Sequence, residues 1–452
     1  MTIWTPRIDD GHGPLYRRIA DAIDRDIGTG LLEPGTRLPP QRDLADELGI
    51  ALTTVTRGYA EAERRGLVSG EVGRGTFVQR AGPQRSNTRY DPSSPIDMTA
   101  NSQLRTLSES IGQIVTRVDP LDSLDYQPVA GGDRPRRAGA EWIRKTGLDA
   151  RPENVLVTTG GQNAILVVLS ALTQPGDVVL VEEVTYSGVK SLANMLNLKL
   201  VGVEVDAEGM NPASLRKKIS SSKPAAMYTM PTLQNPTARV MSDERRRALA
   251  EIANEFEVPV VEDDSYGFLI PDLKPMSCYV NESYYLTGTS KSLASGLRIG
   301  FVHAPTDMVE RLAAAICTIT WMASPMLAEV VAEWIFDGTA DQIVEWKRRE
   351  SRERQEIAQK ILADSDCRAN AAAQHIWLRL PEPWSAREFV AHARMRGVLI
   401  SAADDFATSP RSAPHSVRIC LCTPIEREAL VRGLETLVEI LSEPPEPCKS
   451  VL

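Results

Sequence analysis

The sequence predicts an α/β protein in two parts, and three observations carry this prediction. The chain has 452 residues, which is enough for two or three domains. Residues 14–80 show helical periodicity three times and then two short strand patterns. From about residue 96, apolar strand runs alternate with amphipathic helices, as in mostly parallel sheets. We therefore expect a small helical block ahead of a large α/β domain.

The first helix of the small block lies in PLYRRIADAIDRDIGTG, where apolar residues recur at helical spacing. Glycines follow the last apolar position and end the helix. The residues that we expect on its inner face are Leu15, Ile19, Ala22, Ile23 and Ile27.

Two more helices and a hairpin complete the block. LPPQRDLADELG predicts a short helix that begins after a Pro-Pro pair and ends at Gly49. IALTTVTRGYAEAERRG predicts a third helix, with Val55, Tyr59 and Ala62 facing inward. LVSGEVGRGTFVQR is typical of two strands around a glycine-rich turn. Three helices followed by a β-hairpin indicate a winged helix-turn-helix.

The rest of the chain divides into a linker and one large domain. Residues 81–95, AGPQRSNTRYDPSSP, are rich in Pro and Ser without apolar periodicity, so we expect a linker. Residues 96–445 are expected to form the large domain, with a smaller α/β segment from about Val330. The strands expected in its buried sheet are VLVTT, VVLVEE, LVGVEV, AAMYTM, VPVVEDD and RIGFVH, and those of the smaller segment are HIWLRL and VRICLCTP.

Composition limits the class of protein. Charged residues make up 25% and apolar residues 42%, as in globular proteins, and no segment approaches the roughly 20 apolar residues of a membrane span. The N-terminal stretch lacks a basic-then-apolar signal pattern, so we expect a cytoplasmic protein. A net charge of −9 argues against a non-specific nucleic-acid coat, but leaves a local DNA-binding face open.

The six cysteines are sparse for this length, which argues against a disulfide scaffold. Cys420 and Cys422 stand one residue apart in SVRICLCTP, as on one face of a strand. Two further metal ligands are not evident nearby, so we expect reduced core thiols and no metal site.

One lysine stands where a reactive amine would be useful. Lys291, in YYLTGTSKSLASGLRIG, follows a strand and precedes a loop of small residues. Ser290 and Arg298 offer a hydroxyl and a guanidinium to an anion. An amine whose ammonium form is disfavoured forms a Schiff base with an aldehyde. An exposed surface lysine is the simpler interpretation of this residue taken alone.

Other segments agree with a cofactor site. VVEDDSYGF ends a strand in acids, where a carboxylate can pair with a protonated pyridine nitrogen. Asp263 and Tyr266 have D-x-x-Y spacing, so the phenol can reach the ring 3-oxygen, as can the amide of Asn235. TTGGQNAIL opens a helix whose first backbone amides suit a phosphate. Tyr186 can stack on a pyridine face.

This set of motifs, in this order, resembles the fold-type I aminotransferase family over roughly residues 96–440. The resemblance implies pyridoxal 5′-phosphate (PLP) as cofactor, a homodimer and a role for each matching residue. Lys291 would form the Schiff base (aldimine), and Asp263 would pair with the pyridine nitrogen. The other implied roles are Asn235 and Tyr266 beside the 3-oxygen, Tyr186 stacked on the ring, Gly161, Gln162, Ser290 and Arg298 at the phosphate, Tyr126 at the neighbouring subunit's phosphate, and Arg418 at a substrate or effector carboxylate.

Two positions depart from the family pattern. Gly288 stands where a hydroxyl residue often precedes the lysine, and Gly160-Gly161 replaces Gly-Ser or Gly-Thr. These departures predict fewer phosphate hydrogen bonds and argue against fast transamination more than against cofactor binding. A strand-edge salt bridge remains the alternative interpretation of Arg418.

The N-terminal block resembles the winged helix-turn-helix of the GntR regulators over residues 14–80. The third helix would enter the major groove. Residues 14–80 contain 10 Arg, no Lys and 10 acidic residues, and Ala51-Leu52 replaces the Ser-Arg that often opens the recognition helix. A structural module without a DNA role is the alternative. The residues that we expect to contact DNA are Arg42, Thr53, Thr54, Arg57 and Arg74.

Together the two resemblances match the MocR subfamily of GntR-type transcriptional regulators. The implied protein is a PLP-dependent, DNA-binding homodimer that reads paired half-sites on double-stranded DNA. PLP, alone or with an amino-compound effector at Lys291, would favour one arrangement of head and body. The alternative is an active amino acid:2-oxo acid aminotransferase with a vestigial head. The departures favour little or no physiological transaminase activity.

Overall fold

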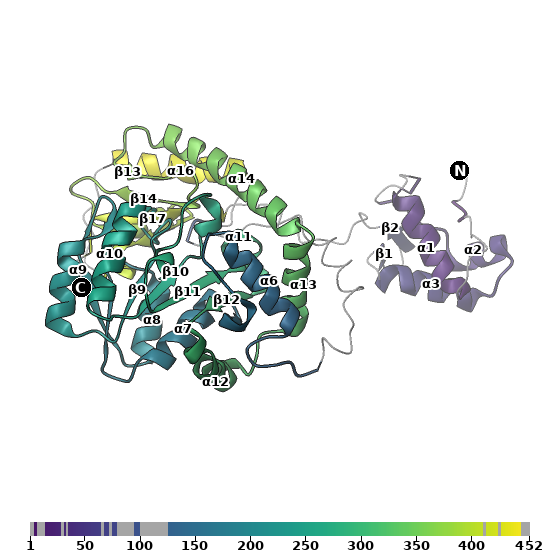
Figure 1. The fold of residues 1–452 in the computed structure, drawn as a ribbon. Coiled ribbons are helices and arrows are strands. Elements are labelled where there is room, and N and C mark those ends of the chain that lie inside the picture. Colours follow the sequence, from purple (N-terminus) through teal and green to yellow (C-terminus); the bar gives the residue numbers. More distant parts are fainter. Residues whose placement is uncertain are drawn as a thin grey trace. The chain divides into compact units, whose positions relative to one another are not determined.

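The computed structural model describes residues 4–6, 14–28, 31–32, 35–64, 67–71, 75–78, 95–99, 125–409, 413–423 and 426–443 (Figure 1). The chain divides into two compact units, Met1–Ser94 and Pro95–Leu452. The expected linker, apart from Pro95, lies outside the described residues. No helix within the described ranges is both long and apolar enough to cross a membrane.

The first unit contains the three expected helices and the expected hairpin. Gly49 ends the second helix in a left-handed conformation, with φ of 64°. Gly58 lets the third helix approach the first, because a Cβ there would lie 2.9 Å from Cγ2 of Ile19. The elements are α1 (Leu15–Gly28), α2 (Gln41–Leu48), α3 (Leu52–Arg64), β1 (Val68–Glu71) and β2 (Gly75–Val78).

The core of this unit confirms most of the inward faces predicted from periodicity. Ile19, Ile23 and Val55 are fully buried, and Tyr59 is almost so. The hydroxyl of Tyr59 donates to the carbonyl of Pro39 at 2.9 Å, which ties α3 to the turn before α2. Leu15, by contrast, is only half-buried, because it opens α1.

The second unit is built on a seven-stranded sheet, with strand order β4-β12-β11-β10-β9-β5-β6. Neighbouring strands are parallel except at β12, which is antiparallel to both β11 and β4. The mostly parallel sheet is therefore confirmed. The strands are β4 (Val155–Thr158), β5 (Val178–Glu182), β6 (Lys199–Val203), β9 (Ala226–Thr229), β10 (Val260–Asp263), β11 (Ser283–Gly288) and β12 (Gly300–His303).

Helices cover both faces of this sheet, so alternate strand residues belong to two different cores (Figure 1). Tyr285 and Phe301 pack with Trp142 and Trp334 on one face, whereas Tyr284 packs on the other. The helices of the unit are α6 (Asp133–Arg144), α7 (Gly161–Leu172), α8 (Ser187–Met195), α9 (Pro212–Ser222), α10 (Asp243–Glu255), α11 (Thr289–Ser292), α12 (Val309–Thr320), α13 (Pro325–Phe336), α14 (Thr339–Ile361), α15 (Ala386–Met395) and α16 (Arg427–Ser442).

A smaller four-stranded sheet, of order β13-β14-β17-β16, forms the C-terminal part of the unit. Its core includes Met98, which directly follows β3 (Ile96–Asp97), and β3 pairs in parallel with β15 (Val398–Leu399). The chain therefore enters the second unit through its small domain. The remaining strands are β7 (Val205–Asp206), β8 (Gly209–Met210), β13 (Cys367–Arg368), β14 (His375–Arg379), β16 (Ser401–Ala402) and β17 (Ser416–Cys420).

Two expectations about this unit are wrong in detail. The run LVGVEV was expected to be a buried strand, but in β6 only Val203 is buried, because β6 ends the sheet and has one neighbour. The small segment was expected from about Val330, which instead packs in a core of the large sheet. Helix α14 joins the two regions: Val344 contributes to the large-domain core and Ala358 to the small-domain core.

Candidate functional site

A cavity of about 260 Å³ lies among the loops that follow the central strands of the large sheet. Parallel strands end at one edge of their sheet, so the loops after β4, β5, β9, β10 and β11 meet there. The predicted cofactor and effector residues that line this cavity are Gly161, Gln162, Tyr186, Asn235, Asp263, Tyr266, Ser290, Lys291, Arg298 and Arg418.

Lys291 lies on the short helix α11 directly after β11. Thr289 anchors the start of α11, since its backbone N and its Oγ1 both donate to the carbonyl of Ile299, at 3.0 and 2.9 Å. From α14, Nζ of Lys347 donates to the carbonyl oxygen of Lys291 at 2.9 Å. The backbone that carries the Lys291 side chain is therefore held from two sides.

The surroundings of Lys291 favour its neutral amine. Burial lowers the pKa of Lys291, an effect that the Cys420 thiol opposes and the charges of Arg418 and Arg298 reinforce. A neutral amine is the nucleophilic form that attacks an aldehyde carbonyl. The cavity thus provides what Schiff-base formation needs.

Asp263 ends β10 with its carboxylate in the cavity wall. Its Oδ1 accepts from the backbone N and the hydroxyl of Ser265, at 3.1 and 2.5 Å, and its Oδ2 accepts from the hydroxyl of Tyr228 at 2.9 Å. Burial raises the pKa of Asp263, whereas the hydrogen bonds from Ser265 and Tyr228 lower it. A carboxylate oriented in this way suits a cationic partner such as a protonated pyridine nitrogen.

The two acids beside Asp263 have structural partners instead. Glu262 accepts from the backbone N and the hydroxyl of Ser277, at 2.7 and 2.6 Å. Asp264 accepts from the hydroxyl of Tyr285 at 2.8 Å. Neither carboxylate lines the cavity. Of the three consecutive acids, only Asp263 is available to a ligand there.

An anion cradle lies at the N-terminus of α7. Gly160 precedes this helix with φ of 91°, a conformation that favours glycine. A Cβ on Gly160 would lie 3.0 Å from Nη2 of Arg298, so the glycine also makes room for the guanidinium. Nη1 of Arg298 donates to the Ser290 hydroxyl at 3.1 Å. Helix amides, a guanidinium and a hydroxyl together suit a phosphate.

Tyrosines stand on two sides of the cavity. The hydroxyl of Tyr186 donates to Oε1 of Gln162 at 2.9 Å, and Nε2 of Gln162 donates to the carbonyl of Gly188 at 3.3 Å. The Gln162 side chain is thus already engaged, which leaves its backbone amide for a phosphate. Tyr266 is buried, and its ring centroid lies 5.7 Å from that of His375.

Arg418, on β17, connects the small domain to the cavity. Its Nη1 donates to Oδ1 of Asn235 at 2.7 Å, and its Nη2 donates to the carbonyl of Thr99 and to the hydroxyl of Ser401. Its guanidinium carbon lies 4.7 Å from the ring centroid of Phe406. No carboxylate among the described residues pairs with it, and its buried Nε has no partner there. The strand-edge salt bridge is therefore not seen in the part of the chain that the structure describes.

Tyr126 does not line the cavity. It is 76% exposed, and its ring centroid lies 5.8 Å from that of Trp321, which is also exposed. The expected role concerned a neighbouring subunit, so it stays a prediction.

Sequence reasoning missed several residues that build this site. Tyr228 and Ser265 orient Asp263, and Lys347 supports the backbone of Lys291. Ser265 had a weak signal, since a serine two residues after an aspartate often bonds to it. Tyr228 and Lys347 had none, because each reaches the site from another element.

The residues present fit PLP. An unpartnered buried nitrogen on Arg418 and the glycine-lined cradle at α7 are both suited to contact an anionic group. Lys291 offers an amine for an aldehyde and Asp263 a carboxylate for a pyridinium, at separate points of one cavity. The donor set therefore matches a phosphate, an aldehyde and a ring nitrogen carried by one molecule.

The predicted DNA-contacting residues lie on two helices of the first unit. Thr53 and Arg57 are exposed on α3 and share one face at i, i+4 spacing, whereas Thr54 is half-buried. Arg42 is exposed on α2. Arg74 lies outside the described residues. These four described side chains are available to a ligand of this unit, and their DNA role stays a prediction.

Helix α3 is fastened to α2 near this face. The hydroxyl of Thr56 donates to Oε1 of Gln41 at 2.8 Å. Leu52, at the position where related heads often have an arginine, is 39% exposed. The surface at the start of α3 is thus more apolar than the GntR pattern implies.

Cysteines do not form a metal site in the described part of the chain. Cys420 and Cys422 are buried and free of disulfides. Within the described ranges no group of three or more His, Cys, Asp or Glu residues is placed to hold a metal ion.

Comparison with known families divides the chain at the same place as the structure does. Residues 100–434 match the family described as aminotransferase class I and II. Residues 15–78 match the family described as bacterial regulatory proteins, gntR family.

Three similar proteins illustrate the two matches. An uncharacterized HTH-type transcriptional regulator, YdeF of Bacillus subtilis, is 31% identical over 97% of both chains. The probable rhizopine catabolism regulatory protein MocR of Rhizobium meliloti is 26% identical over 84% of this chain and 82% of its own. The crystal structure of an archaeal alanine:glyoxylate aminotransferase has a TM-score of 0.72 at 26% identity, over 79% of this chain and 93% of its own.

Proposed function

Because the chain belongs to the aminotransferase class I and II family and carries a GntR helix-turn-helix ahead of that domain, as MocR-type regulators do, we propose that it is a transcriptional regulator controlled by PLP. The observation that supports this most is the joint presence, in one chain, of exposed polar side chains on α3 and a cavity lined by ten of the predicted cofactor and effector residues. A regulator of this kind acts on the chromosome, so the cytoplasmic location is part of the same proposal.

In this proposal each cavity residue has one task toward the cofactor. PLP, when bound, supplies an aldehyde for amines and a pyridine ring that withdraws electrons. The Lys291 amine provides the covalent attachment point. Asp263, oriented by Ser265 and Tyr228, would pair with the ring nitrogen and favour its protonated form. The remaining tasks are ring stacking by Tyr186, bonds to the 3-oxygen by Asn235 and Tyr266, and phosphate binding by Gly161, Gln162, Ser290 and Arg298.

The effector side of the cavity is the surface around Arg418. Its guanidinium already bonds to Asn235, so a carboxylate that arrives there must share or displace that bond. A small amino acid would offer a carboxylate to Arg418 and would present its amine on the side of the cavity where Lys291 lies. We therefore propose an amino-compound effector, alone or as a modulator of the cofactor signal.

DNA binding in this proposal needs two heads. Residues 14–80 balance 10 Arg against 10 acidic residues, so one head has no net charge and little general attraction for phosphates. The aminotransferase family is typically dimeric, and a two-fold dimer reads paired half-sites. Affinity from a single head is expected to be weak, and paired heads gain from effective concentration.

The alternative function is a working aminotransferase, and one feature of the cavity is consistent with it. Lys291, Asp263 and Arg418 all face the same space, as transamination requires. A sensor that exchanges amines at the same lysine needs these groups as well. The two functions therefore differ in output, in turnover or in DNA binding, rather than in site residues.

The proposal is tested by measuring, with fluorescence anisotropy, how the full-length protein binds the DNA upstream of its own gene, with and without PLP. Wild type should bind specifically and change its affinity when PLP is added. Arg57→Ala should weaken DNA binding, and Lys291→Ala should bind DNA but lose the response to PLP. Arg137→Ala, an exposed arginine of the second unit, is the matched control for charge. Absence of any specific complex, together with rapid turnover of an amino donor and a 2-oxo acid, would establish the aminotransferase instead.

A further inference from the structure

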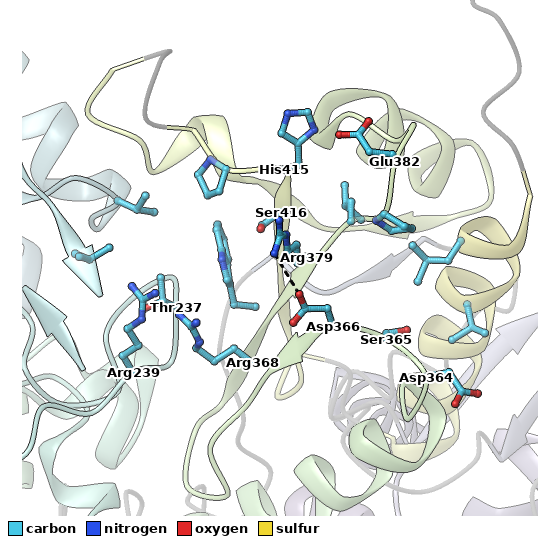
Figure 2. A pocket seen from close by; sticks show the side chains of 18 of the residues that line it. Thr237, Arg239, Asp364, Ser365, Asp366, Arg368, Arg379, Glu382, His415 and Ser416 are labelled. Carbon is cyan, nitrogen blue, oxygen red and sulfur yellow. Dashed lines mark ion pairs between the residues drawn. The ribbon is translucent and has the colours of Figure 1, made fainter. Parts of the chain in front are cut away.

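A second and larger cavity, of about 1050 Å³, lies in a cleft between the two sheets of the second unit (Figure 2). One wall comes from the loop between β9 and α10, and the other from the small domain around β13 and β14. Lys291 and the other cofactor residues do not line it. The cleft is thus separate from the cofactor cavity.

Three arginines line this cleft, and their partners differ. Arg379 forms an ion pair with Asp366 at 3.7 Å, drawn as a dashed line in Figure 2. No carboxylate within the described part of the chain forms an ion pair with Arg239 or Arg368, whose side chains come from opposite walls. Figure 2 shows these two side chains directed toward one another beside Thr237. Two positive groups therefore approach each other, and no ion pair within the described part of the chain neutralises either of them.

Arg239 bears the larger cost of this arrangement. Its Nε is buried and has no hydrogen-bond partner among the described residues. Burial, reinforced by the charge of Arg368, lowers the pKa of Arg239 to about 10, while Asp206 and Glu183 oppose the change. Both of these acids have other partners: Asp206 pairs with Arg245 at 2.9 Å, and Oε1 of Glu183 accepts from the backbone N of Val205 at 3.1 Å. Buried guanidinium nitrogens normally have hydrogen-bond acceptors. An anionic ligand would supply the acceptor that Nε of Arg239 lacks.

The other walls define what kind of anion fits. Trp377 is largely buried and presents an apolar surface, continued by Leu380 and Leu441. Thr237 and Ser416 add hydroxyls beside the arginines. Four acids also line the cleft and repel a second negative group there: Glu183, Asp364, Asp366 and Glu382. Of these, Asp366 is paired with Arg379. The cleft thus combines one cationic end with an apolar body, as small-molecule sites commonly do.

We propose that this cleft is a second ligand site, which binds a small organic anion and holds its carboxylate or phosphate group between Arg239 and Arg368. Because Arg239 belongs to the large domain and Arg368 to the small domain, the ligand joins the two. The site itself does not depend on the proposed regulatory function.

The loop that carries Arg239 also reaches the cofactor cavity. The carbonyl of Arg239 accepts from the backbone N of Gln234 at 2.8 Å, and the next residue, Asn235, accepts from Arg418 in the cavity. On the small domain, Ser416 in the cleft and Arg418 in the cavity stand two residues apart on β17. We therefore expect an anion bound in the cleft to alter the hydrogen bond between Asn235 and Arg418. This link to effector sensing rests on the proposed function.

Isothermal titration calorimetry on the full-length protein, loaded with PLP, tests the site with two probes, inorganic phosphate and succinate. PLP fills the anion cradle at α7, so two places for a probe remain, Arg418 in the cofactor cavity and the cleft, and variants separate them. Wild type should bind at least one probe, and the stronger of the two identifies the anion type. Arg239→Gln and Arg368→Gln should each weaken binding by about tenfold or more. Arg368→Lys, which keeps the charge, should restore part of the affinity.

Two matched variants locate the heat of binding. Arg379→Gln removes a cleft arginine that already has a partner, and Arg137→Gln removes an exposed arginine that lines neither cavity; both should bind the probe within about twofold of wild type. Equal losses in all four glutamine variants, or no binding of either probe to wild type, would overturn the proposal. Binding that is lost in Arg418→Gln but kept in Arg239→Gln would place the anion in the cofactor cavity and would also overturn it. If Arg239→Gln fails to fold, the exposed Arg368 position carries the test with its Gln and Lys variants.

Discussion

The cofactor cavity and the arginine cleft lie in the same unit and both contain arginines, but the hydrogen-bond and ion-pair partners of those arginines differ. Around Lys291, several polar groups already have protein partners: Asp263 has Ser265 and Tyr228, and Arg298 has Ser290. In the cleft, Arg239 and Arg368 form no ion pair with a carboxylate of the described residues. The first is organised for a group held in one fixed orientation. The second is an electrostatic site that a diffusing anion completes.

The largest difference between the two cavities is expected when Lys291 is replaced. Lys291→Ala should abolish covalent attachment, so the visible absorbance of the bound cofactor is lost and dialysis removes PLP completely. The amine is the attachment point in the proposal, and no other lysine lines the cavity among the described residues. Lys145→Ala, at an exposed lysine that pairs with Asp341, should retain the band. A band that survives dialysis in Lys291→Ala would assign the attachment elsewhere.

The next effect concerns Lys347, whose amine donates to the carbonyl oxygen of Lys291. Lys347 is 3% exposed, and burial lowers its pKa from 10.5 to about 8. The folded pKa is the lower one, so between pH 8 and 10.5 the unfolded chain binds more protons at this position and stability rises with pH. The full change is about 3 kcal/mol, and below pH 8 the folded protein carries all of this cost.

Lys347→Met should remove this dependence, which urea unfolding at pH 7 and at pH 10 would measure. The advantage of the variant over wild type should shrink by up to about 3 kcal/mol as the pH rises. Lys145→Met provides the matched control, because Lys145 is exposed. A difference between Lys347→Met and wild type that stays constant with pH would show that Lys347 titrates like an exposed lysine.

A third test compares an acid from each cavity. Asp263→Asn should lower the affinity for PLP by about 10- to 100-fold, because a charge-assisted bond to the ring nitrogen is lost. Asp366→Asn, in the arginine cleft, should leave PLP affinity unchanged. Equilibrium dialysis against PLP measures both. Equal affinities in the two variants would remove Asp263 from the cofactor site.

The smallest expected effects are on the free energy of unfolding, and they have opposite signs in the cofactor cavity and in the cleft. Tyr228→Phe should lower the free energy of unfolding by about 2 kcal/mol, since Asp263 loses a hydrogen bond in a buried site. Arg239→Met should leave it unchanged or raise it by up to about 1 kcal/mol in phosphate-free buffer, since an unpartnered buried nitrogen is removed. Chemical denaturation of both variants decides the signs. A clear loss of stability in Arg239→Met would mean that Arg239 has a structural partner.

The sequence predicted the frame of the site well because its signals are local. Buried parallel strands are continuous apolar runs, and the residues after them meet at one edge, so Lys291, Asp263 and Asn235 could be found beside their strands. The error at β6 has the same origin, since an apolar run does not reveal whether a strand ends the sheet.

Other features could not be predicted because they depend on packing between distant segments. Tyr228 reaches Asp263 from the neighbouring strand, and Lys347 reaches Lys291 from α14. Arg239 and Arg368 carry no motif, and they meet only because β13 folds back against the loop after β9. A search for motifs therefore finds the cofactor cavity and passes over the cleft.

The short loop from Gln234 to Arg239 has a consequence for how signals combine. It places Asn235 in one cavity and Arg239 in the other, and a hydrogen bond between its two ends keeps them in a fixed relation. Thermodynamic linkage is reciprocal: an anion that changes the affinity for the cofactor by some factor has its own affinity changed by the same factor. Two metabolites would then be read jointly, so that the response to each depends on the abundance of the other.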